Sequence, residues 1–367
     1  MVRVKPRWTR LSLDRVSWQR YHFADQLPSR RLRTVVGIRA ALQDNRMTLV
    51  VIPDDRSGSF AQSANTRRLE AVAEVVIHDS VPAGPEDLAS RVRDADVIVS
   101  FRPAFTKFPA VVLRACERLR MICISGTGVE DVDVAEASKR GIAVANVAGA
   151  SNQAVAEMCI ALMFDVARHV SRAHGVIRGG KWQGFEGIEL QGKTLGILGL
   201  SAIARHLVPL AAGIGMRVLS WSHNNDPARA KAAGAMAASL ADVLRESDVL
   251  SLHMRLFPEL AGFLGEKEFA QLKPGAILIN TARGELVDEA ALIAALASGR
   301  LRGAGLDVFA LQPLPEQHPL RDLPNVVLSP FNAWNTTDAS ERMLRQSVDN
   351  VLNFLSGHPT NVVNPAR

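Results

Sequence analysis

The sequence predicts an α/β fold built on parallel sheets, and two observations lead to this prediction. From Met47 onwards, short apolar runs alternate with stretches of helical period, and strands separated by helices pair in parallel with both faces of the sheet covered. In addition, residues 190–225 contain a strand, a glycine turn, a helix and a second strand, which together form a βαβ unit. A chain of 367 residues is long enough for two domains of ordinary size.

Each expected strand is a short apolar run with turn or helical sequence on either side. In the first half of the chain the expected strands are 48–52, 74–77, 96–101, 121–125 and 142–146. In the second half they are 194–198, 217–221, 249–253, 276–280, 305–309 and 326–328. Polar or charged residues stand at or just after the ends of the strands at 249–253, 276–280 and 305–309. Open α/β sheets bind their ligands at such strand ends.

The long helical patterns indicate how the two domains are arranged along the chain. Residues Asn152 to about His174 read as one helix between the two βα blocks, with Gly175 as its stop. The last helix, Thr336 to Leu355, is expected to fold back on the first block, which makes that domain discontinuous. The expected divisions are a basic extension at 1–46, a substrate domain at 47–150 plus 336–367, and a second domain at 151–335.

Composition limits the class of protein. Hydrophobic residues make up 47% of the chain, which is ample for two cores, and no uninterrupted apolar run reaches the length of a transmembrane helix. The three cysteines, Cys116, Cys123 and Cys159, lie in apolar segments without the spacing of metal ligands. They predict buried thiols in a reducing compartment, with neither a metal site nor a disulfide framework.

The positive net charge belongs to the amino-terminal extension. Residues 1–46 hold eleven Lys or Arg and three Asp, a charge of +8, so the remainder of the +6 chain carries 6 − 8 = −2. A nucleic-acid-binding surface on the folded body is therefore not expected. The extension has the Arg-rich composition of a transit peptide or a nucleic-acid-binding tail. We favour an appended or mis-started segment, with Met47 opening the fold.

The glycine turn of the βαβ unit predicts a nucleotide site. The free N–H groups and partial positive charge of the helix that follows suit a pyrophosphate. The positions of the Gly-x-Gly-x-x-Gly pattern hold Gly199, Ser201 and Ala204. Ser201 adds a Cβ atom where the backbone should approach the phosphates, and Pro209 should kink the helix. We interpret 151–335 as a dinucleotide-binding domain; the alternative is an ordinary βαβ turn that binds no nucleotide.

Several collinear motifs over residues 47–365 resemble the D-isomer-specific 2-hydroxyacid dehydrogenase family, which includes phosphoglycerate dehydrogenases and glyoxylate/hydroxypyruvate reductases. The motifs are Gly-Thr-Gly-Val-Glu-Asp-Val-Asp at 126–133, Ser-Asn-Gln-Ala-Val-Ala-Glu at 151–157, the turn at Gly199, Asn-Thr-Ala-Arg-Gly at 280–284 and Gly-Leu-Asp-Val-Phe at 305–309. The resemblance implies two Rossmann-like domains with a cleft between them. It also implies hydride transfer between a nicotinamide and C2 of a 2-hydroxy or 2-keto acid.

The resemblance assigns catalytic roles, and two of the positions depart from the family pattern. Arg283 matches the arginine that holds the substrate carboxylate and polarises the C2 oxygen. The glutamate that orients and charges the catalytic histidine is Gln312 here, as it is in the related formate dehydrogenases. The catalytic histidine itself is replaced by Phe331, which cannot exchange a proton. His318 and His253 are the candidates for a replacement base; otherwise His318 is structural and His253 shapes the cofactor pocket.

The remaining site residues also follow from the resemblance. The cofactor-binding residues expected are Gly199, Leu200, Ser201, Ala202, Ile203, Ser222, His223, His253, Thr281, Ala282, Arg283 and Asp307. The substrate residues expected are Phe101, Arg102 and Arg283, with Arg102 either holding a second carboxylate or phosphate or remaining solvated. Ser222 stands where an acidic residue would bind the ribose diol. Because repulsion of a 2′-phosphate is then absent, and Arg229 and His223 could attract one, the cofactor is NAD or NADP.

The resulting hypothesis is a cytoplasmic, homodimeric NAD(P)-dependent 2-hydroxyacid dehydrogenase of low activity that reduces a small 2-keto acid such as glyoxylate or hydroxypyruvate. It needs no metal and involves no nucleic acid or membrane. The alternatives are a nucleotide-binding sensor or scaffold that has lost catalysis, and an enzyme that takes a hydride from a substrate such as formate, which needs no proton exchange. Gln312 favours the last reading mildly.

Overall fold

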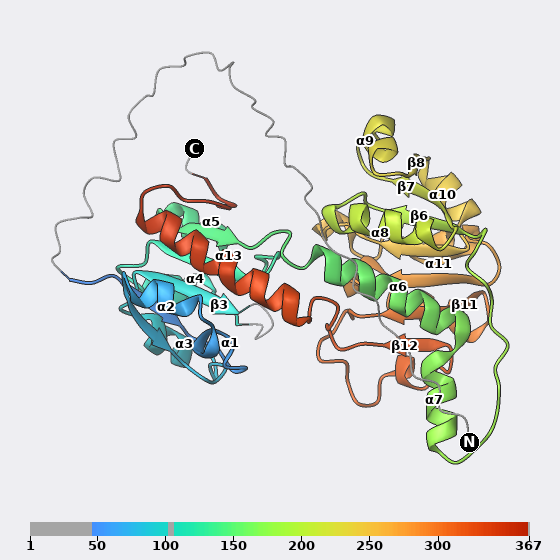
Figure 1. Cartoon of the computed structure of the whole chain (residues 1–367), viewed down its shortest axis with the longest axis horizontal. Coiled ribbons are helices and arrows are strands. Elements are labelled where there is room, and N and C mark those ends of the chain that lie inside the picture. Colours follow the sequence, from blue (N-terminus) through green and yellow to red (C-terminus); the bar gives the residue numbers. More distant parts are fainter. Residues whose placement is uncertain (1–45, 102–105, 366–367) are drawn as a thin grey trace, which may run out of the picture. The chain divides into compact units, whose positions relative to one another are not determined.

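A computed structural model describes residues 46–101 and 106–365, and its described part contains two parallel sheets (Figure 1). The first sheet has five strands in the order β2-β1-β3-β4-β5. The strands are β1 (Leu49–Ile52), β2 (Glu74–Ile77), β3 (Val97–Phe101), β4 (Met121–Ser125) and β5 (Ala143–Asn146). All of their pairings are parallel. The predicted α/β class with parallel sheets is confirmed.

The helices around the first sheet come from both ends of the chain. They are α1 (Ser59–Gln62), α2 (Thr66–Glu70), α3 (Pro85–Val92), α4 (Ala110–Ala115), α5 (Val134–Lys139) and α13 (Thr337–Leu355). The last of these, drawn in red in Figure 1, lies beside elements from the blue end of the sequence. Its buried side chains Met343, Val348 and Val351 share one apolar core with strands β1, β3 and β4. Burial of this apolar face fixes α13 against β4.

The second sheet has seven strands among the described residues, in the order β12-β11-β10-β9-β6-β7-β8. The strands are β6 (Thr194–Leu198), β7 (Arg217–Trp221), β8 (Met236–Ala237), β9 (Val249–Leu252), β10 (Ala276–Asn280), β11 (Leu301–Leu306) and β12 (Val326–Leu328). The chain runs outward from β6 through β7 to β8 and then returns to β9 on the other side of β6. The strand order therefore reverses between β6 and β9, which is the place where such sheets bind ligands.

The helices of the second half cover this sheet. The α-helices are α6 (Asn152–Arg168), α7 (Val170–Arg178), α8 (Ala202–Gly213), α9 (Pro227–Ala232), α10 (Leu240–Glu246), α11 (Glu266–Gln271) and α12 (Glu289–Ala297). Short 3-10 turns lie at η3 (Pro258–Leu260), η4 (Gly284–Leu286) and η5 (Pro319–Arg321). Pro209 lies inside α8, which continues past it to Gly213.

The structure corrects two predictions about element boundaries. The single helix expected from Asn152 to His174 is broken at His169, whose φ of 56° is left-handed, and Gly175 lies inside α7 rather than at a helix end. The Asp165 carboxylate accepts the backbone N–H of Ser171, which favours a new helix start at that point. The strand expected at 305–309 is β11 at Leu301–Leu306, because pairing with β10 begins at Leu301 and ends at Leu306.

Two glycines in β11 allow α6 to lie unusually close to the second sheet. A Cβ atom on Gly305 would come within 2.8 Å of Leu162 Cβ and 3.0 Å of Ile279 Cδ1. A Cβ atom on Gly303 would come within 2.4 Å of the Asn325 carbonyl oxygen. These glycines therefore set the distance between the helix and the strand, and they explain why β11 has a weak strand pattern in the sequence.

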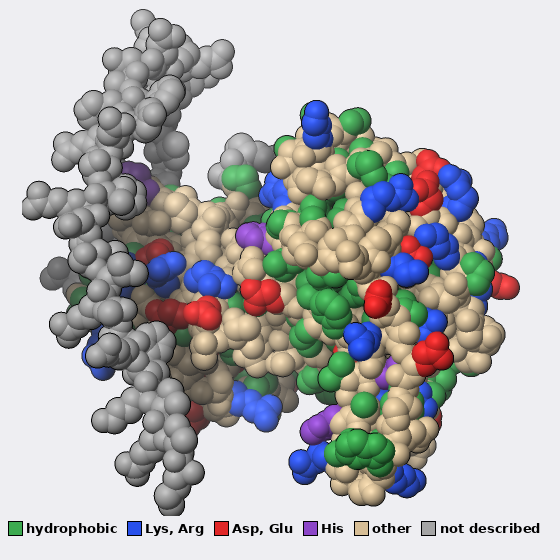
Figure 2. Space-filling model, turned by 45° about the vertical axis from the view of Figure 1, so that its right-hand side comes forward, with side chains coloured by type: hydrophobic (Ala, Val, Ile, Leu, Met, Phe, Trp, Pro, Cys, Tyr) green, Lys and Arg blue, Asp and Glu red, His purple; other side chains and the backbone are tan. Residues whose placement is uncertain are grey.

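On the face that Figure 2 shows, Lys and Arg side chains are interspersed with Asp and Glu, so this face is neither strongly positive nor strongly negative. At the start of the described chain, Arg46 pairs with Asp96 at 3.2 Å, and Arg118 pairs with the same carboxylate at 3.3 Å. Among the described residues, no helix combines the length and the apolar character needed to cross a membrane.

We predict that Gly305→Ala destabilises the protein by about 1–3 kcal/mol, because the added methyl group meets Leu162 and Ile279 in a packed core. Gly213→Ala is the control: Gly213 ends α8 with no heavy atom within 4 Å of the new methyl group. That substitution should stabilise the protein by about 0.4–1 kcal/mol. Denaturant unfolding of both variants measures the difference, and equal effects would contradict the packing argument.

Candidate active site

The expected site residues gather where the strands of the second sheet end. Gly199 follows β6, Ser222 follows β7, His253 follows β9, and Thr281 follows β10. Asp307 follows β11. Because all the strands run parallel, their carboxyl ends share one edge of the sheet, and the loops that leave this edge form the site.

The turn after β6 requires glycine at position 199. Its φ is 92°, and a Cβ atom there would lie 2.9 Å from the backbone of His253 and Met254. The adjacent Ser201 caps α8, its hydroxyl accepting the Ala204 N–H at 3.2 Å. The N–H groups of Ala202 and Ile203 in the first helical turn have no partner within the helix, so they suit an anion. This geometry fits the pyrophosphate of a dinucleotide, with the Ser201 side chain turned toward the helix.

Helix α9, which follows β7, brings a guanidinium to the same turn. Arg229 Nη2 donates to the Leu200 carbonyl oxygen at 3.0 Å, although the two residues lie 29 positions apart. Ser222 is half-buried, and His223 and Arg229 are exposed. The position expected to hold an acidic residue therefore carries a hydroxyl, with an imidazole next to it in the sequence and a cation on α9. Such a set accommodates a phosphate at least as well as a ribose diol.

Arg283 is held in place by its own turn and by one residue from the first half of the chain. The buried Asn280 side chain donates to the Arg283 carbonyl at 2.9 Å and accepts the Ala282 N–H at 3.0 Å. The guanidinium donates to the Ala282 carbonyl at 2.7 Å and to Glu130 Oε1 at 2.9 Å. The Arg283 side chain is 27% exposed and that of Glu130 is 53% exposed. A carboxylate therefore already lies on the arginine expected to bind one.

Asp307 fixes the loop that contains Phe331. Its carboxylate accepts the N–H groups of Asn332 at 2.7 Å and Ala333 at 3.0 Å, and its carbonyl oxygen accepts the N–H of Phe331 at 2.9 Å. Burial raises the pKa of Asp307, while hydrogen bonds from Ser329, Ala333 and Asn332 oppose the rise. Phe331 has a φ of 56°, a conformation that costs energy for a bulky residue and persists only where the surroundings impose it.

The two histidines considered as replacement bases are occupied by structural contacts. His253 is buried, its Nε2 lies 2.8 Å from the Ser251 hydroxyl, and burial lowers the pKa of this histidine to about 4. His318 Nδ1 accepts the Leu320 N–H at 3.3 Å and its Nε2 lies 3.0 Å from Glu289 Oε1. His253 is therefore neutral near pH 7, and His318 caps η5 with both ring nitrogens engaged.

Three other expected residues have defined surroundings. The Gln312 side chain donates to the Phe309 carbonyl at 3.3 Å, within the loop after β11. Thr281 Oγ1 lies 3.2 Å from the sulfur of Cys159 on α6, and burial raises the pKa of that thiol to about 12. The Phe101 ring packs edge-on against Phe60 and Trp334 and is only 7% exposed. Its side chain belongs to the first core, and its contact with substrate stays a prediction; Arg102 lies outside the described residues.

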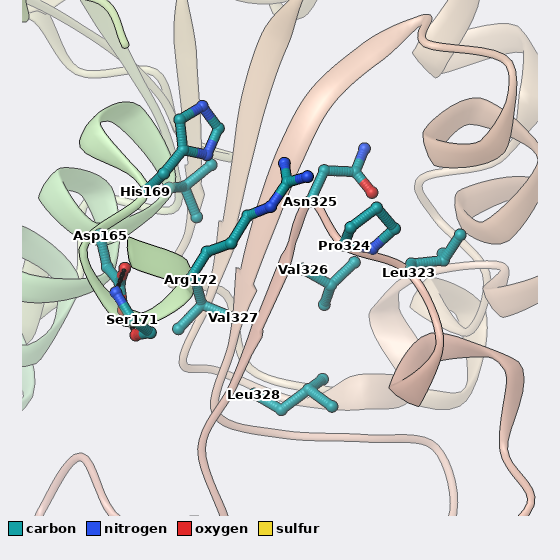
Figure 3. Close-up of a pocket in the computed structure, with 11 residues that line it drawn as sticks. Asp165, His169, Ser171, Arg172, Leu323, Pro324, Asn325, Val326, Val327 and Leu328 are labelled. Carbon is teal, nitrogen blue, oxygen red and sulfur yellow. Dashed lines mark hydrogen bonds between the residues drawn. The ribbon is translucent and has the colours of Figure 1, made fainter. Parts of the chain in front are cut away.

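A cavity of about 340 Å³ lies away from these strand ends, between the bend at His169 and the edge strand β12. Figure 3 shows Arg172 reaching from the helical side toward Asn325, with His169 above it and Pro324 beside the asparagine. None of the residues expected to bind cofactor or substrate lines this cavity.

Comparison with known proteins places this geometry in a family. Residues 160–333 match the family described as D-isomer specific 2-hydroxyacid dehydrogenase, NAD binding domain. A hydroxypyruvate reductase of Blautia hydrogenotrophica is 33% identical over 305 residues, 81% of this chain and 94% of that protein. The chain belongs to the D-isomer-specific 2-hydroxyacid dehydrogenase family.

Two further relatives extend the comparison of this dehydrogenase. A glyoxylate reductase of Aeropyrum pernix is 37% identical over 293 residues, 77% of this chain and 87% of that protein. An acyclic imino acid reductase solved with NADPH and D-Arg superimposes with a TM-score of 0.78 at 27% identity, covering 86% of this chain and all of that one. The dehydrogenase fold has two Rossmann-like sheets, and the cofactor class is NAD or NADP.

Sequence reasoning missed two residues of the dehydrogenase site. Asn280 clamps the turn that presents Arg283, and Glu130 pairs with that arginine. Both lie inside motifs that carried the family resemblance, but neither received a role. The signal for Asn280 was a polar side chain that ends an otherwise apolar strand. The contact of Glu130 joins positions 153 residues apart, and no local pattern indicates it.

We predict that buried His253 makes the dehydrogenase sensitive to acid. An unfolded histidine has a pKa near 6.5. Between that value and about pH 4 the unfolded chain binds a proton that folded His253 does not, so the free energy of unfolding falls as the pH falls. The loss of melting temperature over this range should be smaller in His253→Gln than in the wild type. His358→Gln, at an exposed position, is the control. Parallel curves for wild type and His253→Gln would contradict the prediction.

Proposed function

We propose that this dehydrogenase reduces a small 2-keto acid at C2 with NADH or NADPH and lacks a side chain that supplies the proton. The observation that carries the proposal is the pairing of Arg283 with a carboxylate at the carboxyl end of β10, beside the loop in which Phe331 replaces histidine. Glyoxylate and hydroxypyruvate are the substrates we expect first, since the relatives at 37% and 33% identity are named for them.

The residues after β6 support binding of the dinucleotide. The Gly199 turn and the first turn of α8 would hold the pyrophosphate, and the bound nicotinamide would supply the hydride. Arg229, fixed to the Leu200 carbonyl, lies where it can approach a 2′-phosphate. With no acidic side chain at Ser222, we propose that NADPH binds at least as tightly as NADH. Asp307 already accepts two backbone N–H groups, so its main contribution is to hold the loop after β12.

Arg283 would bind the substrate carboxylate through two parallel N–H···O bonds. Its guanidinium would also polarise the C2 oxygen, on which negative charge grows during hydride transfer. To reach it, the substrate replaces Glu130. The proton that completes the alcohol would come from water, because Phe331 carries no exchangeable proton and His253 is buried and neutral near pH 7. Gln312, which donates a hydrogen bond to the Phe309 carbonyl, would orient the loop after β11 without adding charge.

Two rival functions remain distinguishable by experiment. A sensor or scaffold would bind NAD(P)H and turn over no acid. A formate-type enzyme would reduce NAD⁺ or NADP⁺ with formate. The relative solved with NADPH is named for reducing imino acids, so compounds with a C2=N bond also belong among the candidate hydride acceptors. Calorimetric titration with NADH and NADPH, followed by turnover on a panel of 2-keto acids and formate, separates these functions; no nucleotide binding would refute the proposal.

We predict that Phe331→His raises keto-acid turnover, because a positioned acid typically contributes about 10²–10⁴-fold. The left-handed backbone at this position suits histidine better than phenylalanine, so the variant should fold. Adding Gln312→Glu should raise the rate further only when it is combined with Phe331→His, since the carboxylate acts through the imidazole. Steady-state kinetics against pH measure this. A fast wild type with a bell-shaped profile near neutral pH would show that another residue serves as the acid.

We predict that Ser201→Gly tightens NADPH binding by about tenfold, equivalent to ~1.4 kcal/mol, because it restores the close backbone approach of the glycine pattern. The control is Ser201→Ala, which keeps the Cβ atom and removes the hydroxyl that caps α8. That variant should lose about 1 kcal/mol of stability without tighter binding. Equal nucleotide affinities for the Gly and Ala variants, measured by calorimetry, would contradict the steric argument.

We further propose a homodimer, with the enzyme in the cytoplasm as its buried thiols suggest. None of the residues of α7 is buried, and Val170, Ile177 and Trp182 are 58%, 49% and 94% exposed. A second copy would cover this apolar surface, since most soluble oligomers are symmetric dimers.

Ile177→Asp with Trp182→Ser should yield monomers in sedimentation or light-scattering measurements. Val111→Asp, at an equally exposed apolar position, should not. A monomeric wild type would contradict the dimer.

A further inference from the structure

Among the described residues, the guanidinium of Arg283 is paired with a carboxylate, and the side chains considered as proton donors are replaced or engaged elsewhere. Phe331 replaces the expected acid, and His318 is engaged with Glu289 and the Leu320 N–H. His253 is buried against Ser251, and burial lowers its pKa to about 4. The charged partner of the Arg283 guanidinium is the Glu130 carboxylate, at 2.9 Å. A reaction that suits this site needs a nearby anion and does not need a proton donor.

Reduction of a ketone has the opposite requirements. Negative charge grows on the C2 oxygen as the hydride arrives, and a donor must neutralise it. A carboxylate within a few ångströms of the reacting atoms disfavours that charge. Glu130 would therefore destabilise the transition state of ketone reduction. In addition, no histidine stands at position 331 to protonate the C2 oxygen.

Reduction of an iminium ion matches both features. Its C2=N⁺ group is positively charged before the hydride arrives, so a neighbouring carboxylate stabilises the bound substrate and offsets repulsion by Arg283. Its nitrogen already carries a proton, so no acid is required during hydride transfer. The substrate carboxylate would still bind Arg283 and displace Glu130 from the guanidinium, and the displaced carboxylate would then pair with the cationic nitrogen.

We propose that the preferred substrate of this site is the iminium ion of a small 2-keto acid with ammonia or a primary amine, held between Arg283 and Glu130. The proposal rests on the proposed function, because it assigns the hydride acceptor of the same site.

The reaction balances without any further reactant. The 2-keto acid and the protonated amine condense in solution, forming the C2=N⁺ bond and releasing one water molecule. At the enzyme, the hydride of the reduced nicotinamide forms a new C–H bond at C2, the π electron pair moves onto nitrogen, and the nicotinamide is oxidised. The product is a secondary or primary amino acid, which takes up a proton from water after it leaves the site.

The test follows NADPH or NADH oxidation by the full chain with glyoxylate or pyruvate in the presence of methylamine. Tetramethylammonium chloride at the same concentration is the control, because it matches the ionic strength and cannot form an imine. We expect methylamine to raise the rate by at least about tenfold, the smallest change that corresponds to a clear preference in transition-state binding. Mass spectrometry should identify the N-methyl amino acid as the main product. Equal rates in the two salts, with only the hydroxy acid formed, would overturn the inference.

Variants test the role of Glu130 directly. Glu130→Gln should lower kcat/KM for the imine by about tenfold, as expected for loss of a hydrogen-bonded charge. It should lower kcat/KM for the keto acid alone by a smaller factor or raise it, and Glu130→Asp should recover part of the imine activity. Glu117→Gln, at an exposed position on the first half of the chain, is the matched charge control. An unchanged ratio of the two activities in Glu130→Gln would refute the assigned role.

The outcomes also separate this inference from the proposed function. Reduction of keto acids to the hydroxy acid at the same slow rate with and without amine supports the proposed function and refutes the iminium preference. Binding of NADPH with no oxidation in any mixture refutes both. The variant Phe331→His separates the two further. It should form more hydroxy acid but no more N-methyl amino acid, because only reduction of the ketone needs the proton that the new histidine supplies.

Discussion

The arrangement of the site depends on parallel strand pairing in the second sheet. Strands β6, β9, β10 and β11 pair in parallel, and the one register shift, between Ala276 and Ile277, lies at the start of β10, so Gly199, His253, Thr281 and Asp307 leave the sheet at one edge. The Gly199 turn lies close to the next loop, because a Cβ atom on Gly199 would come within 2.9 Å of the backbone that follows β9. A side chain at Gly199 would push apart the two loops between which a dinucleotide has to fit. The absence of a Cβ atom at one residue thereby preserves the register of the whole edge.

A second constraint comes from the buried carboxylate of Asp307. Burial disfavours its charge, and three backbone or side-chain donors from the loop after β12 compensate for the lost water. The same hydrogen bonds hold Phe331 in a left-handed backbone conformation. The loop is therefore built to present one side chain at a fixed position, whichever residue stands there.

The sequence predicted the strands well, and the reasons for its failures are physical. Strands β2, β4, β6, β7, β10 and β12 have the predicted ends, because each is a short, largely apolar run bounded by turn residues. The break at His169 was missed because the apolar period continues through it. The hydrogen bond that the Ser171 N–H donates to the Asp165 carboxylate depends on three-dimensional placement. Strand β11 begins before the predicted residue because Gly303 and Gly305 weaken the apolar pattern of the sequence. Glycine is needed at these positions for the close approach of α6, not for strand propensity. The site residues at strand ends followed from the motifs, whereas the Glu130–Arg283 pair joins distant loops and has no local signature.

The Glu130–Arg283 pair would make substrate binding less sensitive to ionic strength. Under the proposed function, a substrate carboxylate displaces an internal one, so the apparent affinity is the intrinsic affinity multiplied by the fraction of molecules in which the pair is open. Both side chains are partly exposed, and dissolved ions weaken such a pair within a Debye length of about 8–10 Å. Added salt therefore weakens the attraction of Arg283 for substrate and at the same time frees Arg283 from Glu130. Because the two effects oppose each other, substrate affinity changes less with salt than it would for an arginine that has no internal partner.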